Sequence, residues 1–141
     1  MSYTVNIEYD LSYKYPLISG YYTALDYHRN GSPKKSQWLI SVDEEISCFV
    51  FAKQNDWISK EDHKGWGITD DCKVLGKTTA NKETFIARFE EYDYNLDHWH
   101  GYPADLGRPQ DIPADFVLLD WYKYKKYITK SQYSKIRRGI L

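Results

Sequence analysis

The chain has 141 residues, of which 42% are hydrophobic and 17% aromatic, and its formal net charge is −1. This length predicts a single domain over residues 1–141 with room for a hydrophobic core, and the abundance of aromatic residues excludes the disordered class, which contains few of them. No apolar run approaches the ~18 residues that a membrane span needs, and no targeting segment precedes the first patterned stretch, so we expect a cytoplasmic protein with no membrane contact.

The first part of the chain, residues 1–97, is dominated by patterns typical of β-strands. Apolar and polar residues alternate over residues 3–11, which predicts a half-buried strand. Residues 46–52 are almost all apolar, and such a short run is typical of a central strand covered on both faces. Further strands are predicted at residues 21–28, 38–42, 72–76 and 84–89. Turns are predicted at residues 30–33 and 43–45.

A different pattern follows at residues 98–112, which contain Trp99, Gly101 and Pro103. Glycine permits unusual backbone angles and proline stiffens the chain, so this segment predicts a corner between two structural halves. Trp99 would pack in the core at that corner.

Residues 113–141 form the last part, for which the pattern predicts a helical tail. Asp111 is a candidate N-cap for its first helix. A second helix is predicted over residues 130–138, because Thr129 is a good N-cap residue and Gly139 a good C-terminal stop.

These patterns together predict an α+β fold, in which an antiparallel sheet of about five to seven strands carries two C-terminal helices packed on it. Charge divides the chain at the same place. Residues 1–112 hold 18 acidic and 12 basic residues, a net charge of −6, whereas residues 113–141 hold 2 acidic and 7 basic residues, a net charge of +5. A basic end on an acidic body indicates either a nucleic-acid patch or a solvated helix that packs on the body.

His98 and His100 are the first candidates for chemistry, since residues two apart in an extended segment point to the same side. A zinc site usually takes four ligands, often with closely spaced cysteine pairs. Cys48 and Cys72 are isolated and are expected to be reduced thiols, so we expect no metal and no cofactor. With Arg108 and nearby acids, the two histidines could form the acid–base site of a small metal-independent nuclease-like enzyme. The lack of a phosphate loop or a serine nucleophile elbow instead favours a protein that is not an enzyme.

The basic tail provides a second candidate site. Residues 128–139 resemble the end of a helix-turn-helix recognition helix. In that arrangement the residues contacting phosphates would be Lys130, Lys135, Arg137 and Arg138. The simpler alternative is a solvated basic helix that closes the fold.

The acidic segment at residues 90–97 provides a third candidate. Tyrosine supplies contact area at low entropic cost and is favoured at interfaces. Acidic neighbours would complement a basic partner and speed its association. The expected partner-binding residues are Glu90, Glu91, Tyr92, Asp93, Tyr94 and Asp97.

Residues 85–139 resemble a segment of small, largely uncharacterised bacterial proteins. The shared pattern is Phe-Ile-Ala-Arg-Phe at 85–89, Trp-His-Gly-Tyr-Pro-Ala-Asp at 99–105, Arg-Pro-Gln-Asp at 108–111 and a basic helical C-terminus that ends in Lys-Ile-Arg-Arg-Gly at 135–139. The resemblance implies a bacterial or mobile-element origin. It implies no known reaction and no ligand set.

The acidic body, the aromatic excess and the lack of a catalytic motif predict binding rather than catalysis. We expect a bacterial immunity or antitoxin-type protein that neutralises a protein toxin, in particular a basic nuclease domain, through its acidic, Tyr-rich surface. One alternative is a nucleic-acid-binding protein that uses the basic C-terminal helix. The other is the small nuclease-like enzyme that uses His98 and His100.

Overall fold

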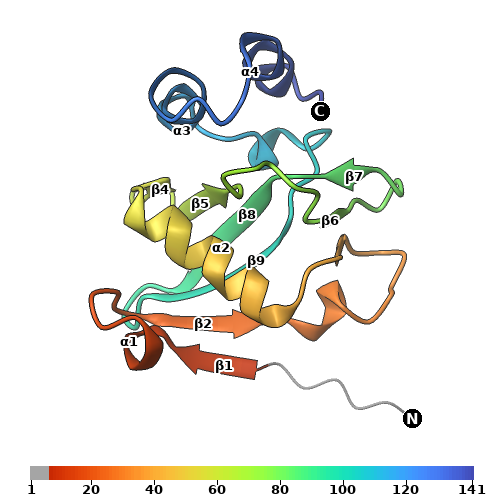
Figure 1. Cartoon of the computed structure of the whole chain (residues 1–141). Coiled ribbons are helices and arrows are strands. Elements are labelled where there is room, and N and C mark those ends of the chain that lie inside the picture. The colour runs from red at the N-terminus through yellow and green to blue at the C-terminus, as the bar shows by residue number, and fades with distance from the viewer. Residues whose placement is uncertain (1–6) are drawn as a thin grey trace.

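The computed structural model describes residues 7–141 and confirms the α+β class (Figure 1). Six strands form one sheet in the order β1-β2-β9-β8-β5-β4, and three short strands form a second sheet in the order β3-β6-β7. All neighbouring strands are antiparallel except β2 and β9, which are parallel. This parallel pair joins the N-terminal hairpin to the strands of the second half.

The strands are β1 (Ile7–Asp10), β2 (Tyr21–Ala24), β3 (Gln37–Trp38), β4 (Ile58–Ser59), β5 (Lys64–Gly67), β6 (Gly76–Lys77), β7 (Glu83–Thr84), β8 (Ala87–Asp93) and β9 (His98–Pro103). The helices are α1 (Leu11–Lys14), α2 (Val42–Gln54), α3 (Asp115–Leu119) and α4 (Lys130–Arg137). Two 3₁₀ turns, η1 (Asp26–His28) and η2 (Pro109–Asp111), and a π-helical turn, η3 (Asp120–Tyr124), complete the set. Of the strand predicted over residues 3–11, the first four residues lie outside the described part and Leu11 already begins α1.

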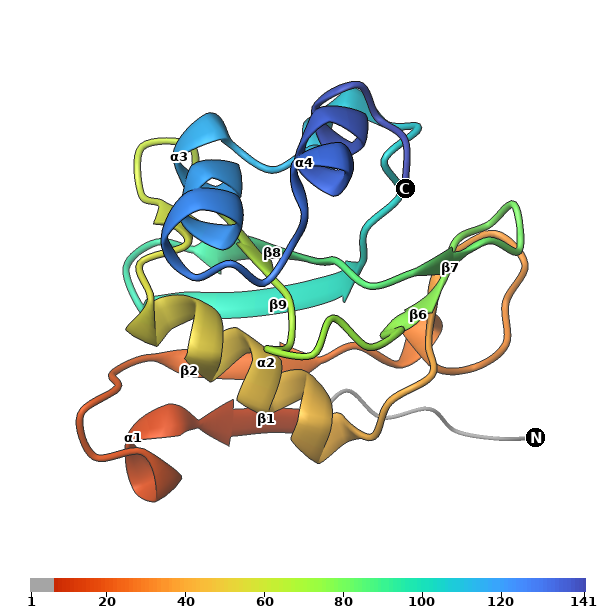
Figure 2. The same cartoon turned by 45° about the horizontal axis from the view of Figure 1, so that its top comes forward.

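The prediction of a central strand over residues 46–52 is wrong, because this run lies inside α2. The helix begins with a capping box, in which the Ser41 hydroxyl accepts from the Glu44 backbone and the Glu44 carboxylate accepts from the Ser41 backbone. The turn predicted at residues 43–45 is therefore the first turn of this helix. A short apolar run fits a buried helix as well as a buried strand, and here it faces the six-stranded sheet (Figure 2).

Phe49 of α2 lies at the centre of the core. Its ring centroid is 5.0 Å from that of Tyr22, 5.0 Å from that of Phe89 and 5.5 Å from that of Trp99. Gly101 leaves room for these rings, since a Cβ atom there would lie 2.4 Å from Cδ1 of Phe89. Gly101 therefore lets β9 pack closely against the aromatic rings of the core, and it does not form a turn.

The prediction of a corner over residues 98–112 is also wrong in its first half. Residues 98–103 form β9, which pairs with both β2 and β8 and lies inside the sheet. The chain turns only after Pro103, through a loop and η2. Glycine and proline are turn signals, but here Pro103 is the last residue of a strand and Gly101 serves packing.

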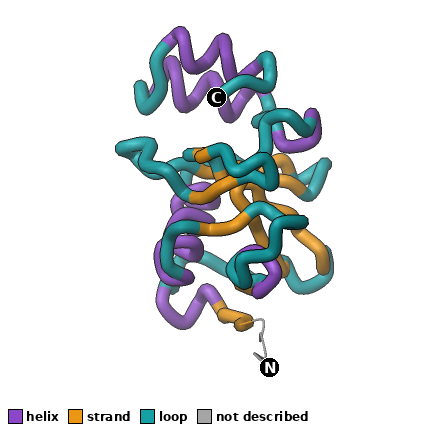
Figure 3. The backbone as a smooth tube through the Cα atoms, turned by 90° about the vertical axis from the view of Figure 1, so that its right-hand side faces the viewer, coloured by secondary structure: helices purple, strands orange, loops and turns teal. Residues whose placement is uncertain are grey.

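The two predicted C-terminal helices are present, and together with η3 they form a helical cap, residues 115–137 (Figure 3). Asp111 is not its N-cap, because Asp111 lies in η2 and Ala114 occupies the N-cap position of α3. Thr129 does cap α4, in a capping box with Gln132. Gly139 follows α4 at a φ of +76°, the conformation that commonly ends a helix.

The helical cap is anchored by Trp121, whose buried ring packs edge-on against Trp57 with centroids 5.6 Å apart. Nε1 of Trp57 also donates to Asp120 at 2.7 Å. Both cysteines are free: Cys48 is buried in α2, and the Cys72 thiol donates to a backbone carbonyl at 3.2 Å. Within residues 7–141, no helix is long and apolar enough to cross a membrane.

Candidate functional site

The candidate site lies on the face of the six-stranded sheet that α2 does not cover (Figure 1). Phe89 and Trp99 pack on the α2 side. Side chains alternate along a strand, so Glu90, His98 and His100 point to the opposite face. Glu90 and His100 are direct cross-strand partners between β8 and β9, which places a carboxylate beside an imidazole.

His98 is held within the protein. It is buried, and its Nε2 atom lies 2.6 Å from the Thr23 hydroxyl and 2.7 Å from the Tyr92 hydroxyl. These contacts join β2, β9 and β8. The ring of Tyr92 also lies 5.2 Å from that of His100, so the rings of His98 and His100 share one side of β9, as their spacing predicts. With its Nε2 atom engaged by two hydroxyls, His98 fits a structural role.

A polar cavity of about 230 Å³ opens beside His100. Its walls come from the 27–36 loop, Thr79, the β8–β9 pair and the 103–111 segment that follows β9. It brings together three of the predicted site residues, which are Glu90, His100 and Arg108. It adds His28, which the sequence analysis did not single out.

His28 contributes an uncharged imidazole to the cavity. Its Nδ1 atom lies 2.9 Å from the Ser36 carbonyl oxygen, which can only accept, so Nδ1 carries the proton and Nε2 retains a lone pair. The ring stacks on Tyr102 with centroids 5.3 Å apart. Burial lowers the pKa of His28 to about 4. The ring is therefore neutral at physiological pH and offers a hydrogen-bond acceptor.

His100 contributes a second imidazole whose pKa is lowered by burial, although the nearby Glu90 carboxylate opposes the shift. Its Nδ1 atom is buried and has no hydrogen-bond partner within residues 7–141. A buried polar atom without a partner is costly. Because Nδ1 exposes almost no surface, it is a local cost of the fold rather than a contact point for a bound group.

The carboxylates of the cavity are already engaged by protein groups. Arg88 is almost fully buried between Glu90, at 3.4 Å, and Asp111, at 3.9 Å. The carboxylate of Asp111 also accepts from the Tyr102 hydroxyl at 2.7 Å and from the Asp105 backbone at 2.9 Å. Asp111 thus holds the 103–111 segment in place as a cavity wall.

The cations of the cavity are not engaged in this way. Lys34, Lys35 and Arg108 line it, and none of them forms an ion pair with a carboxylate in the described part of the chain. Lys35 lies over the ring of Tyr27 at 5.2 Å. The cavity rim therefore presents positive charge to an incoming ligand.

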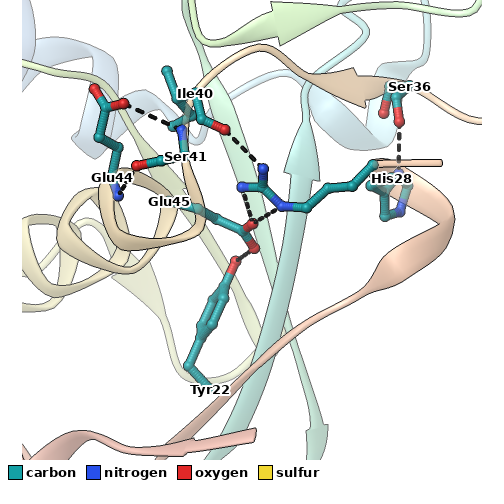
Figure 4. Close-up of polar contacts among 8 residues, drawn as sticks. Tyr22, His28, Ser36, Ile40, Ser41, Glu44 and Glu45 are labelled. Atoms are coloured by element: carbon teal, nitrogen blue, oxygen red, sulfur yellow. Dashed lines mark hydrogen bonds and ion pairs between the residues drawn. The ribbon is translucent and has the colours of Figure 1, made fainter. Parts of the chain in front are cut away.

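A buried polar network fixes the segment that carries His28 (Figure 4). Arg29, the next residue, donates to the Glu45 carboxylate at 2.7 and 3.2 Å and to the Ile40 carbonyl at 2.7 Å. The Tyr22 hydroxyl donates to the other oxygen of Glu45. Glu45 is fully buried, and burial raises its pKa. The network ties η1 to α2 and β2, so His28 is held by rigid elements.

The predicted acidic partner surface is divided by the structure. Glu90 belongs to the cavity, whereas Glu91 bonds Nδ1 of His63 at 2.9 Å and Asp97 pairs with Lys53 at 2.7 Å. Glu91, Asp97 and Tyr94 line a separate hollow. Side chains alternate along β8, so Glu90, opposite His100, and Glu91, opposite Trp99, point to different faces of the sheet. The large hydrophobic side chains of this segment, Tyr92, Tyr94 and Leu96, are all exposed.

The predicted nucleic-acid-binding residues all lie exposed on α4 or directly after it: Lys130, Lys135, Arg137 and Arg138. Arg137 lies 3.4 Å from the exposed Asp115 and over the ring of Tyr133. These cations do not line the cavity. Only Arg108 among the predicted basic residues does so.

Sequence reasoning missed His28, Lys34, Lys35 and Arg88 as site residues. Asp111 was among the acids considered beside the histidines and was also taken as a helix cap, whereas Arg88 was noticed only as part of a strand pattern. No local signal marks His28 as a site residue, because the cavity residues with which it is grouped, such as His100 and Arg108, come from β9 and the 103–111 segment. A buried arginine inside a predicted strand is the one signal that could have indicated a polar face.

The cavity combines groups suited to phosphate recognition and proton acceptance. Two neutral imidazoles, three carboxylates (Glu90, Asp105 and Asp111) and three cations line it. They include the groups that the metal-independent nuclease hypothesis requires, with His28 in the place of His98. No group of three or more metal-ligating side chains is found within residues 7–141.

Comparisons with known proteins leave the family of this chain open. No protein-family model matches it, and no solved structure does. The chain is similar to the pre-mRNA-splicing factor SLU7 of the yeast Debaryomyces hansenii, with 30% identity over 126 residues. The match covers 84% of this chain but only 28% of the length of that splicing factor.

The neutral state of His28 predicts a pH-dependent stability. The free imidazole has a pKa near 6.5 and the folded one about 4, so the unfolded chain binds more protons between these values. The free energy of unfolding should therefore fall as the pH drops from 6.5 to 4, by on the order of 2 kcal/mol from this group after allowance for solvent in the cavity. Urea denaturation at pH 7.0, 5.5 and 4.0 measures it.

The matched variant is His28→Asn, whose amide nitrogen can replace Nδ1 but does not titrate. Its loss of stability between pH 7 and pH 4 should be smaller than that of the unaltered protein by the contribution of His28. Equal losses in the two proteins would contradict the assignment of a neutral, buried His28.

Proposed function

We propose that this protein binds a nucleotide unit, a phosphate with its sugar, in the cavity between β8, β9, the 27–36 loop and the 103–111 segment. The observation that carries the proposal is the combination of three rim cations, which form no ion pair with a carboxylate of residues 7–141, with two uncharged imidazoles in the wall. Phosphate oxygens accept hydrogen bonds from lysine and arginine, and the arginine fork suits them best.

The size of the cavity supports a compact ligand. Its volume of about 230 Å³ is below the ~300–1,000 Å³ that is common for drug-sized ligands. A phosphate and a sugar fit this scale, with the phosphate at Arg108 and Lys35. The sugar hydroxyls would then meet Nε2 of His28.

Two further observations agree with this function but do not carry it. The splicing factor that resembles this chain acts, by its name, on pre-mRNA, and the partial match makes any shared ligand part of the proposal. Free cysteines agree with a reducing compartment such as the cytoplasm, which is where we place the protein.

Isothermal titration with adenosine 5′-monophosphate tests the proposal. The Arg108→Gln and Lys35→Gln variants should each bind about tenfold more weakly, because each loses a charge-assisted hydrogen bond to phosphate. Lys14→Gln removes an equal charge from α1, outside the cavity, and should bind as the unaltered protein does. Failure of the unaltered protein to bind at millimolar ligand would contradict the function.

A second candidate function is the neutralisation of a protein toxin, and one observation favours it. At the end of β8 and in the following turn, Tyr92, Tyr94 and Leu96 are 52%, 62% and 53% exposed, and exposed aromatic groups favour interfaces. When it is added in an amount equal to that of a nuclease toxin encoded by its neighbouring gene, the protein should then inhibit the toxin. The double variant Tyr94→Ser/Leu96→Ser should lose that inhibition, and the lack of any complex would refute this candidate.

A further inference from the structure

We propose that the ligand of the cavity is single-stranded RNA, whose chain continues from the cavity onto the basic C-terminal end of α4. The inference rests on the nucleotide-binding function proposed above and names its substrate class. It is argued from the position of α4, from the charge of the helical cap and from the acceptor in the cavity.

The C-terminal end of α4 lies directly against the loop that carries Arg108. Gly139 approaches this loop so closely that a Cβ atom on it would lie 2.7 Å from the Leu106 carbonyl oxygen. Arg108 and Asp105, on either side of this contact, line the cavity. Figures 1 and 2 show the C-terminus beside this segment in both views. Arg137 and Arg138 directly precede Gly139, so their backbone lies close to the loop that carries Arg108. The Arg137 side chain pairs with Asp115, and Nε of Arg138 donates to the Ser134 carbonyl at 3.3 Å.

The charge of the helical cap and its flanks suits a polyanion. Residues 113–141 carry seven basic and two acidic residues. All seven basic side chains are exposed. Both acids are engaged, since Asp115 pairs with Arg137 and Asp120 accepts from Trp57. A phosphate chain that leaves the cavity at Arg108 would next meet Arg138 and Arg137.

Aromatic rings accompany these cations. Tyr122 and Tyr133 stack with centroids 5.1 Å apart, and the Arg137 guanidinium lies 5.3 Å from the centroid of Tyr133. Single-strand-binding surfaces combine cations for the backbone with flat groups on which bases stack. The small cavity holds one nucleotide unit, so the neighbouring nucleotides must lie outside it, and this surface is adjacent.

The acceptor in the cavity favours RNA over DNA. Nε2 of His28 has a lone pair, and a ribose 2′-hydroxyl is a donor that deoxyribose lacks. A site that offers an acceptor to a sugar hydroxyl discriminates against the sugar without it.

Two measurements together test the inference. Fluorescence anisotropy gives the affinity for a labelled twelve-nucleotide oligouridylate, and isothermal titration gives the affinity for adenosine 5′-monophosphate. The oligonucleotide should bind at least tenfold more tightly than the mononucleotide, and the corresponding oligothymidylate more weakly than the oligouridylate. Arg137→Gln/Arg138→Gln should weaken oligonucleotide binding about tenfold and reduce the slope of log affinity against log salt by about 1.4. It should leave mononucleotide binding unchanged.

The control variant Lys14→Gln/Lys60→Gln removes the same charge from α1 and the β4–β5 connection and should leave both affinities unchanged. If the mononucleotide binds but lengthening it adds no affinity, or if the arginine variant binds the oligonucleotide normally, this inference is wrong and the proposed function stands. Equal affinity for the two oligonucleotides would overturn the assignment to RNA. If the mononucleotide does not bind, the proposed function itself fails.

Discussion

Replacement of Arg29 by Met is expected to lower the free energy of unfolding by about 3–5 kcal/mol, because it leaves a buried carboxylate without its partner. Glu45 is fully buried and receives two hydrogen bonds from Arg29, with only Tyr22 as a further donor to the carboxylate. Arg29 also satisfies the Ile40 carbonyl. Urea denaturation at pH 7 measures the change.

Glu44, the residue before Glu45 in α2, provides a matched control at the surface. Glu44 pairs with Lys73 at the surface, where both side chains are more than two-fifths exposed. Lys73→Met should change stability only slightly, since solvent screens such pairs. A third variant, Arg29→Met/Glu45→Leu, removes both charges and should recover most of the loss. Similar effects of Arg29→Met and Lys73→Met would show that Glu45 is not desolvated as the structure has it.

The Arg29 network also bears on the proposed ligand site. Arg29 follows His28 directly, so loosening of η1 should displace the imidazole from the cavity wall. In buffer without urea, under conditions where the Arg29→Met variant remains folded, its affinity for adenosine 5′-monophosphate should fall. The Lys73→Met variant should bind this nucleotide as the unaltered protein does.

Asp111→Ala is the second substitution for which we expect a large effect, a loss of about 3–5 kcal/mol. Asp111 and Arg88 are 0% and 1% exposed, so the change removes the carboxylate beside a buried guanidinium. The Tyr102 hydroxyl and the Asp105 backbone N–H lose their acceptor as well, and unsatisfied buried donors add to the cost. Thermal and chemical denaturation both report it.

The neighbouring Asp105→Ala is the control for Asp111→Ala. Its carboxylate is partly exposed and accepts only from the Gly107 backbone at 3.0 Å, so we expect a loss of about 1 kcal/mol or less. Asp111→Asn should fall between the two, because the amide oxygen can still accept one bond but carries no charge. An Asp111→Ala variant as stable as Asp105→Ala would contradict the buried Arg88–Asp111 pair.

Some elements could be predicted because their signals are local. The C-terminal helices were predicted, and the second was predicted with its caps, since Thr129 and Gly139 act on the backbone within a few residues of their own position. The cap predicted for the first helix, Asp111, was wrong. The helix α2 was missed although Ser41 and Glu44 form a capping box, because the apolar run that follows has no clear period. Hydrophobicity alone does not distinguish a buried helix from a buried strand of that length.

The candidate site could be predicted only in fragments. The spacing of His98 and His100 correctly indicates one side of a strand, and Glu90 and Arg108 were among the predicted site residues. The sequence analysis grouped Glu90 with Glu91 and Asp97 on a partner surface. The structure instead places Glu90 opposite His100, so this grouping was wrong. His28 was not noticed, because nothing in its own segment distinguishes it from a histidine in an ordinary loop.

By itself, the sequence determined the α+β class, the two C-terminal helices with the Thr129 cap of the second, the contrast between an acidic body and a basic tail, and the placement of His98 and His100 on one side of a strand. Propensity, capping and alternation act within a few residues of the chain, so these features are readable without a fold. Only the tertiary structure decided that β2 pairs with β9, that His28 meets His100, and that the end of α4 lies against the loop of Arg108. These contacts join segments far apart in sequence, and they depend on strand order and on the packing of α2, which no local pattern encodes.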